Sequence, residues 1–137
     1  MHDVTLLAYI VVVLVITMWP SPPDPGSNPL LLRLLDWAHG AGLPAAFDLV
    51  TAEVVANVAM FVPLGLLLAT SARVSRPWLA VAVGLALSAA IETVQIALPG
   101  RHPTVQDVVA NTAGAALGAA AVVAVRALRR RRARRTS

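Results

Sequence analysis

The chain of 137 residues contains no cysteine and no lysine, and it has few charged residues of any kind. The absence of cysteine excludes disulfides, thiol chemistry and any zinc site with cysteine ligands. Charged residues amount to 13% of the chain, against roughly 25% in soluble domains. A soluble domain of this length exposes much of its surface and needs polar residues to cover it. This composition therefore excludes an ordinary soluble fold.

Hydrophobic residues make up 58% of the chain and are gathered into long runs. A bilayer core is crossed by about 20 apolar residues, so the runs predict an all-α, polytopic transmembrane bundle of about four helices. The first run is short, but no arginine or lysine precedes it and Trp19-Pro20 follows it, which favours an uncleaved helix over a signal peptide. We expect one domain over residues 1–137, with spans at about 4–19, 53–71, 78–98 and 105–125 and a basic tail at 126–137.

The first outer loop is predicted to contain a short helix. Asn28 suits an N-cap, Pro29 the first helical position and Gly40 the stop. Several leucines and a tryptophan form an apolar side, and Arg33 and Asp36 share the opposite side. The helix is too short to span, so we expect it to lie in the membrane interface.

The net charge of +4 comes from arginines that are concentrated at the C-terminus. With both termini in the cytoplasm, the inside would hold Arg73, Arg76 and seven tail arginines, and the outside Arg33 and Arg101. Nine against two is a clear positive-inside bias, and the tail would also attract anionic lipid headgroups. We expect no nucleic-acid binding, because no recognition fold or basic face accompanies the tail. The seven tail residues are Arg126, Arg129, Arg130, Arg131, Arg132, Arg134 and Arg135.

Polar residues inside spans are costly, and here they gather at the predicted outer ends. The inner halves of the spans carry almost none. The outer turn between the third and fourth spans adds Arg101 and His102. The ionisable chemistry of the membrane region is thus expected at the extracytoplasmic surface. The polar residues of the spans are Glu53 and Asn57, Glu92 and Gln95, and Asp107 and Asn111.

Each of the last three spans carries a stripe of residues at helical spacing, polar at the outer end and small further in. The residues at 53, 57, 61, 65 and 69 recur every fourth position, as do those at 80, 84, 88 and 92. Gly114 and Gly118 form a GxxxG pattern, which lets helices approach closely. We expect the three stripes to face one another, closing the bundle at the cytoplasmic side and leaving a polar pocket at the other.

The motifs in these stripes resemble those of the VanZ-like family. Asn57-Val-Ala-Met-Phe61-Val-Pro63-Leu-Gly65 is similar to its Asn-x-x-x-Phe-x-Pro-x-Gly signature, and Glu92-Thr-Val-Gln95 to its Glu-x-x-Gln. Arg101, followed by Asp107-Val-Val-Ala-Asn111-Thr-Ala-Gly114, is similar to its Arg…Asp-x-x-x-Asn-x-x-Gly. The resemblance covers roughly residues 48–125, while the first helix and outer loop agree only in placement.

The resemblance implies a small, multi-pass protein of the bacterial cytoplasmic (inner) membrane. The family is named for a member linked to low-level resistance to teicoplanin, a lipoglycopeptide, outside the route that remodels peptidoglycan precursors. No reaction is established for most of the family. The resemblance therefore implies a setting in the cell envelope more than a mechanism.

The individual polar residues leave alternatives open. Glu92 is either a structural partner of Arg101, Asn57 or Asn111, or a group that binds a headgroup or transfers a proton. Arg101 either grips phosphate in a planar fork or pairs with a carboxylate.

Most of the other motif residues favour structural roles, while Asp107 has either a capping role or a role with Arg101, or both. Asp107 follows Thr104 by three residues, as in an approximate capping box. Asn57, Gln95 and Asn111 suit hydrogen bonds between helices. Pro63 is expected to kink its helix. No metal and no cofactor are expected, since the spacing of His39 and His102 matches no ligand motif.

The leading hypothesis is an envelope protein without strong catalysis that binds an amphiphile at the outer leaflet. The partners would be membrane lipids and a lipid-linked wall precursor or lipoglycopeptide, and a homo-oligomer is compatible with this. The alternatives are an outer-leaflet enzyme acting on a lipid phosphate or prenyl-linked sugar, and a structural partner of another membrane protein. The polar contact would come from Glu92, Arg101, Asp107 and Asn111, held in place by Asn57 and Gln95, with Pro63, Gly65, Gly114 and Gly118 in structural roles.

Overall fold

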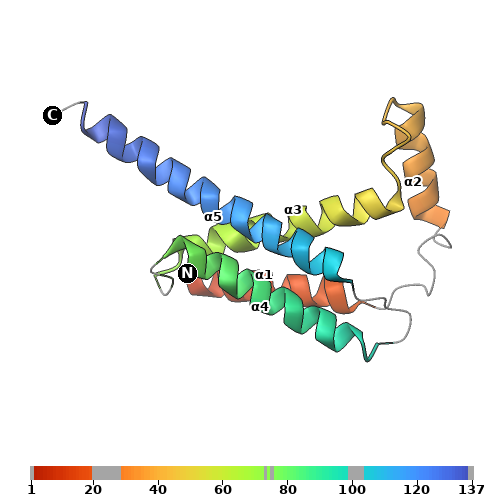
Figure 1. Ribbon diagram of the computed structural model, residues 1–137, viewed down its shortest axis with the longest axis horizontal. Helices are drawn as coiled ribbons and strands as arrows, with labels where there is room; N and C mark the ends of the chain where they lie inside the picture. Colours follow the sequence, from red (N-terminus) through yellow and green to blue (C-terminus); the bar gives the residue numbers. More distant parts are fainter. Residues whose placement is uncertain (1, 20–28, 73, 75, 99–103, 136–137) are drawn as a thin grey trace.

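The computed structural model describes residues 2–19, 29–72, 74, 76–98 and 104–135. The described chain is helical, with no strand, which confirms the all-α prediction (Figure 1). The helices are α1 (His2–Met18), α2 (Pro29–Gly40), α3 (Leu49–Thr70), α4 (Pro77–Gln95) and α5 (Val105–Ala133).

Three of the helices are long and apolar enough to cross a membrane. They are α3 with 22 residues, α4 with 19 and α5 with 29, and about 20 residues cross the hydrocarbon core. α1 is apolar but shorter. The sequence predicted a fourth span to end at 125, whereas α5 continues through the arginines to Ala133. At 1.5 Å per residue α5 is about 44 Å long, so it extends beyond a core of about 30 Å.

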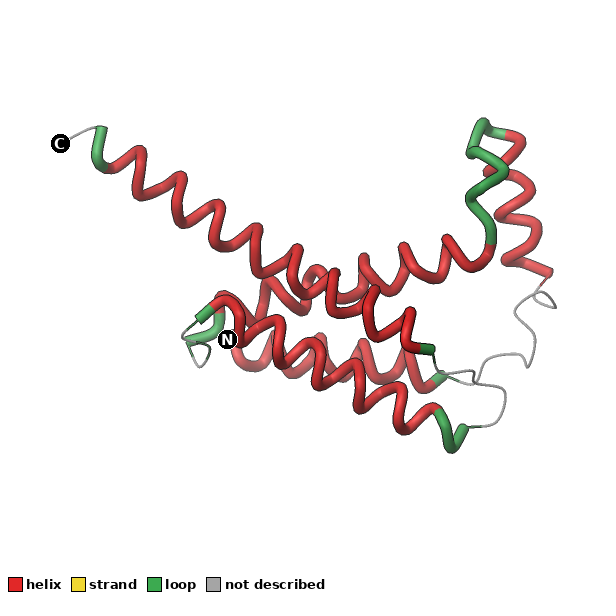
Figure 2. Tube along the Cα trace, in the orientation of Figure 1, coloured by secondary structure: helices red, strands yellow, loops and turns green. Residues whose placement is uncertain are grey.

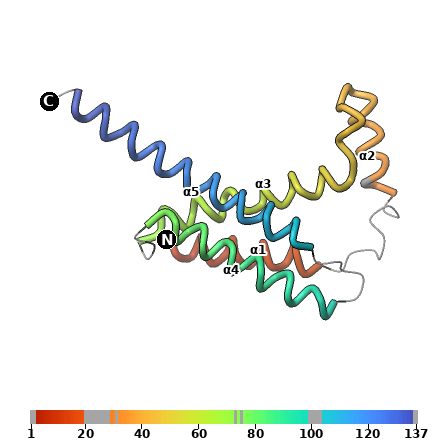
Figure 3. Tube along the Cα trace, in the orientation of Figure 1, coloured from red at the N-terminus to blue at the C-terminus, as the bar shows by residue number. Residues whose placement is uncertain are grey.

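The bundle consists of α1, α3, α4 and α5. The most extensive contacts join α3 to α5, α4 packs on both, and α1 packs on α3 and α4. In Figure 2 the loops lie at the two ends of the bundle, and the last turns of α5 project from it alone. Figure 3 shows that the chain begins near the α3–α4 connection and that α2 stands apart from the other helices. The C-terminal part of α5 and the isolated α2 are thus exposed at opposite ends.

The tight contact between α3 and α5 depends on glycine. A Cβ atom built on Gly118 would collide with the carbonyl oxygen of Val62, and one on Gly65 with the carbonyl oxygen of Ala115. Because these neighbours are backbone atoms, a side chain could be accommodated only by moving the helices apart. Small residues of the predicted stripes therefore bring the two backbones together.

The end of α2 is set by a glycine other than the expected one. α2 does end at Gly40, but the left-handed residue is Gly42, with φ of 104°. The N–H of Leu43 bonds the carbonyl of Ala38 at 3.0 Å, and that of Gly42 bonds the carbonyl of His39 at 3.0 Å. These two bonds form a Schellman motif. The predicted N-cap, Asn28, lies outside the described residues.

α3 begins four residues before its predicted start at 53 because Asp48 caps it. Asp48 Oδ1 accepts the backbone N–H and the hydroxyl of Thr51, both at 2.8 Å. These hydrogen bonds, the backbone bond first, lower the pKa of the Asp48 carboxyl below its ordinary value. At the same end of the bundle α4 stops at Gln95, three residues short of the predicted end at 98.

Candidate functional site

Five of the six predicted binding residues lie at the same end of the bundle. Asn57 is near the start of α3, Glu92 and Gln95 are in the last turn of α4, and Asp107 and Asn111 are in the first turns of α5. Because α4 runs antiparallel to α3 and α5, the end of α4 lies beside the starts of α3 and α5. Arg101, the sixth residue, lies outside the described part of the chain.

Hydrogen bonds join three helices at this end. Asn57 Nδ2 donates to Asp107 Oδ1 at 2.7 Å. The Thr104 hydroxyl donates to Asp107 Oδ2 at 2.9 Å, and the Thr104 backbone N–H donates to Glu92 Oε2 at 3.0 Å. The result is a continuous polar network from α3 through α5 to α4, which we call the Asn57–Glu92 network.

Thr104 occupies the N-cap of α5, as its spacing from Asp107 predicted. Its hydroxyl oxygen accepts the N–H of Asp107 at 3.1 Å. In a complete capping box the side chain three residues later would accept the backbone N–H of the cap residue. Here that N–H goes to Glu92 on another helix. The carboxylate of Glu92 thus lies at the positive end of the α5 dipole, which favours a negative charge.

A second polar contact lies deeper between α4 and α5. Asn111 Nδ2 donates to Ser88 Oγ at 2.9 Å, and the two side chains are 2% and 0% exposed. Within the described chain, Asn111 Oδ1 is a buried atom that has no hydrogen-bond partner. Buried polar atoms normally have one, so Asn111 presents a vacant acceptor beneath the network.

Two of the residues considered from the sequence have partners elsewhere. Gln95 Nε2 donates to the carbonyl of Thr17 at 2.8 Å, which ties α4 to α1. His39 Nε2 donates to the carbonyl of Phe47 at 3.0 Å, which closes the loop between α2 and α3. Gln95 therefore supports α1, and His39 shapes a loop. His102 lies outside the described residues.

Sequence reasoning missed the bridging role of Thr104 and the partners Ser88 and Thr17. Thr104 was recognised as a cap and Ser88 as a member of a stripe, but the bonds they make across helices were not foreseen. Glu92 accepts the backbone N–H of Thr104, while the amide nitrogens of Asn57 and Asn111, two of the partners considered for it, donate to Asp107 and Ser88. No sequence signal marks a backbone N–H that leaves its own helix.

The network borders an apolar outer surface. Glu92 is 9% exposed, whereas Val105 and Ile96 beside it along the chain are 80% and 73% exposed. A carboxylate at membrane depth must be paired or protonated, and the network supplies donors to Glu92 and Asp107. The arrangement places carboxylate and amide groups next to an exposed apolar surface, which is compatible with contact with lipid acyl chains.

These features define a helical membrane protein with a polar network at one end of its bundle. The VanZ/LLP1 family model matches residues 6–126, and the chain belongs to this VanZ-like family. The match includes most of α1 and all of α2, whereas the short motifs recognised in the sequence begin only after α2. No curated protein and no solved structure matches the chain.

Proposed function

We propose that this VanZ-like protein binds an amphiphile at the extracytoplasmic leaflet of the bacterial inner membrane. The observation that carries the proposal is the Asn57–Glu92 network, which holds two carboxylates at one end of a bundle whose outer surface is apolar. A molecule with a polar head and a hydrocarbon tail fits both features.

The proposed topology has four spans and two cytoplasmic termini. α1 is the fourth span, since it packs on α3 and α4 along the bundle and its flanking residues can lengthen it. α2 lies in the outer interface, where Leu30, Leu34 and Trp37 are 66%, 54% and 72% exposed and suit the headgroup boundary. The distribution of the arginines supports this orientation by the positive-inside rule.

Each residue of the site has a distinct part in the proposed recognition. Glu92 and Asp107 accept hydrogen bonds from hydroxyl or amine groups of the head, and Asn57 holds Asp107 in place. Asn111, buried beneath the network, supports it through its bond to Ser88. Arg101, in the turn before Thr104, would hold a phosphate as a planar fork. The ligand class is a lipid-linked wall precursor or a lipoglycopeptide, and binding it would give low-level resistance to teicoplanin.

Analysis of co-purifying lipids tests the proposal. The full chain is purified in mild detergent, and bound lipid-linked wall precursors, which differ in mass from ordinary phospholipids, are measured by mass spectrometry. Wild type should retain such a lipid, and Arg101→Ala should lose it with helical content unchanged. Arg33→Ala is the matched control, since Arg33 is the other outer arginine and is exposed on α2. Equal retention by both variants, or no lipid in wild type, would refute the proposal.

A structural role is the main alternative, and specific contacts favour it. The bonds of Asn111 to Ser88 and of Gln95 to Thr17 join helices without reaching the surface. If the whole cluster serves only to hold helices together, Glu92→Gln should alter lipid retention only in proportion to lost stability. An enzyme acting on a lipid phosphate would instead give a product that disappears in Glu92→Gln while lipid binding persists.

A further inference from the structure

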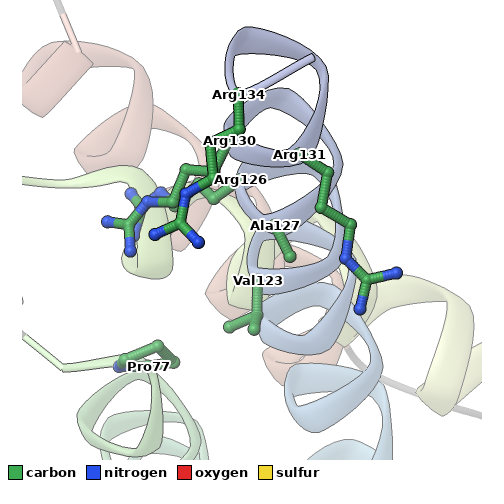
Figure 4. A pocket seen from close by; sticks show the side chains of 7 residues that line it. All are labelled: Pro77, Val123, Arg126, Ala127, Arg130, Arg131 and Arg134. Carbon is green, nitrogen blue, oxygen red and sulfur yellow. The ribbon is translucent and has the colours of Figure 1, made fainter.

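We propose that the end of the bundle opposite the network contains a second site, which binds the headgroup of an anionic phospholipid. The site is a groove between the start of α4 and the C-terminal part of α5. Figure 4 shows the residues that line it: Pro77 on α4, and Val123, Arg126, Ala127, Arg130, Arg131 and Arg134 on α5. We call it the arginine groove. It shares no residue with the Asn57–Glu92 network.

The arginines of the groove follow the helical repeat. Arg126, Arg130 and Arg134 are four residues apart and therefore share one face of α5. In Figure 4 their side chains gather on one side of the helix, and Arg131 lies on the other side. Residues of α5 in this region are exposed. The groove thus has a cationic rim built on regular helix, since α5 continues to Ala133.

One arginine fixes the groove to the bundle. Arg126 Nη2 donates to the carbonyl of Ala69 at 2.9 Å. That carbonyl belongs to the last turn of α3 and has no partner within its own helix. Arg126 therefore anchors α5 to the end of α3 and sets the position at which the helix leaves the bundle.

The other arginines are available to a ligand. The side chains of Arg130, Arg131 and Arg134 make no hydrogen bond or ion pair with any residue of the described chain. The start of α4 adds a second source of positive potential. Its N-cap, Arg76, is a cation whose side chain makes no capping bond, so no acidic side chain at the cap offsets the positive end of the helix dipole.

The groove also has an apolar part, which points to a lipid rather than to a free anion. Val123, Ala127 and Pro77 line it below the arginines, where α5 passes from its apolar segment into its basic one. Trp78, next to Pro77, is 58% exposed, as expected of an aromatic residue at a membrane interface. A phosphate would lie among the guanidinium groups, and the glycerol and first methylenes would lie on the apolar part. With the topology proposed above, this is the cytoplasmic leaflet, which carries anionic lipid.

Native mass spectrometry of the full chain in detergent tests the groove. Phosphatidylglycerol is titrated in, with phosphatidylcholine as the zwitterionic comparison. The test variant is Arg130→Gln with Arg134→Gln, which removes two groove cations and leaves the Arg126 anchor. The matched control is Arg129→Gln with Arg132→Gln, which removes the same charge from residues that do not line the groove. Wild type should prefer phosphatidylglycerol.

The site predicts a difference between the two double variants. The groove variant should bind phosphatidylglycerol about 30-fold more weakly than wild type, since it loses two basic contacts of roughly 1 kcal/mol each. The control should bind less than about threefold more weakly, because its two arginines do not line the groove. Equal losses in the two variants would show that charge acts diffusely and would overturn the proposal. So would displacement of the lipid by millimolar inorganic phosphate. Neither result depends on the outer network, so this test and that of the proposed function can fail separately.

Discussion

Thr104 donates its backbone N–H to Oε2 of Glu92 at 3.0 Å, and this bond fastens the start of α5 to the end of α4. The same residue holds Asp107 through its hydroxyl. Thr104 is thus the junction of the polar network, although its side chain is neutral and it lies at the edge of the family motifs. Substitution at this junction separates the roles of its hydroxyl and its backbone.

Replacing Thr104 with alanine should destabilise the protein. The change removes the hydroxyl that caps α5 and bonds Asp107, and loss of an N-cap side chain costs about 0.5–2 kcal/mol. Thr104→Ser keeps the hydroxyl and should stay close to wild type. Thermal unfolding followed by circular dichroism in detergent measures both. Equal unfolding temperatures for the two variants would mean that the cap contributes nothing.

Gly118→Ala should loosen the contact between α3 and α5. The new Cβ would collide with the carbonyl oxygen of Val62 and approach the backbone nitrogen of Leu66 to 2.7 Å. Overpacking typically costs about 1–3 kcal/mol. Gly40→Ala is the control, because a Cβ there meets no atom within 4 Å. The same unfolding assay should show a lower transition temperature for the first variant alone.

The four-span topology can be tested by labelling, and the absence of cysteine gives a clean background. Single cysteines are introduced as His2→Cys, Asp36→Cys and Ser137→Cys, and intact cells are treated with a membrane-impermeant maleimide. Asp36→Cys should be labelled, and the other two only after the cells are opened. Labelling of His2→Cys but not Ser137→Cys in intact cells would show that α1 does not span.

Expression in a Gram-positive host should lower susceptibility to teicoplanin if the outer site acts on the drug or its lipid neighbourhood. Glu92→Gln and Arg101→Ala should return susceptibility to that of the empty-vector strain, because both remove groups proposed to contact the head of the ligand. Immunoblots of membranes establish equal abundance. Full protection by both variants would exclude the network from this activity.

The cap of α3 should depend on pH. The pKa of Asp48 is lowered in the folded protein, mainly by the backbone N–H of Thr51. A lowered folded pKa means that the contribution to stability is present above the unfolded pKa of about 3.9 and is lost as the pH falls through the folded pKa. Amide exchange at Thr51 should therefore accelerate over that acidic range. Asp48→Asn, which still caps but does not titrate there, should remove the change.

Much of the bundle could be predicted from the sequence because its signals are local. The runs of apolar residues predicted α3, α4 and α5. The small and polar residues at every fourth position identified the helix faces that pack. Gly65 and Gly118 lie where those faces meet, because glycine lets the backbones of two helices approach each other closely. Helix ends were predicted less well: Asp48 starts α3 early and Gly42 terminates α2, through hydrogen bonds that depend on loop geometry.

The sequence by itself determined which residues share a helix face, which end of the bundle is polar and which is basic. These properties follow from the 3.6-residue repeat and from the cost of polar groups in lipid. Only the tertiary structure decided the partners: Glu92 with Thr104, Gln95 with Thr17, and Arg126 with Ala69. Partner choice depends on how far each helix is rotated and shifted against its neighbours, which is fixed by packing across the whole bundle.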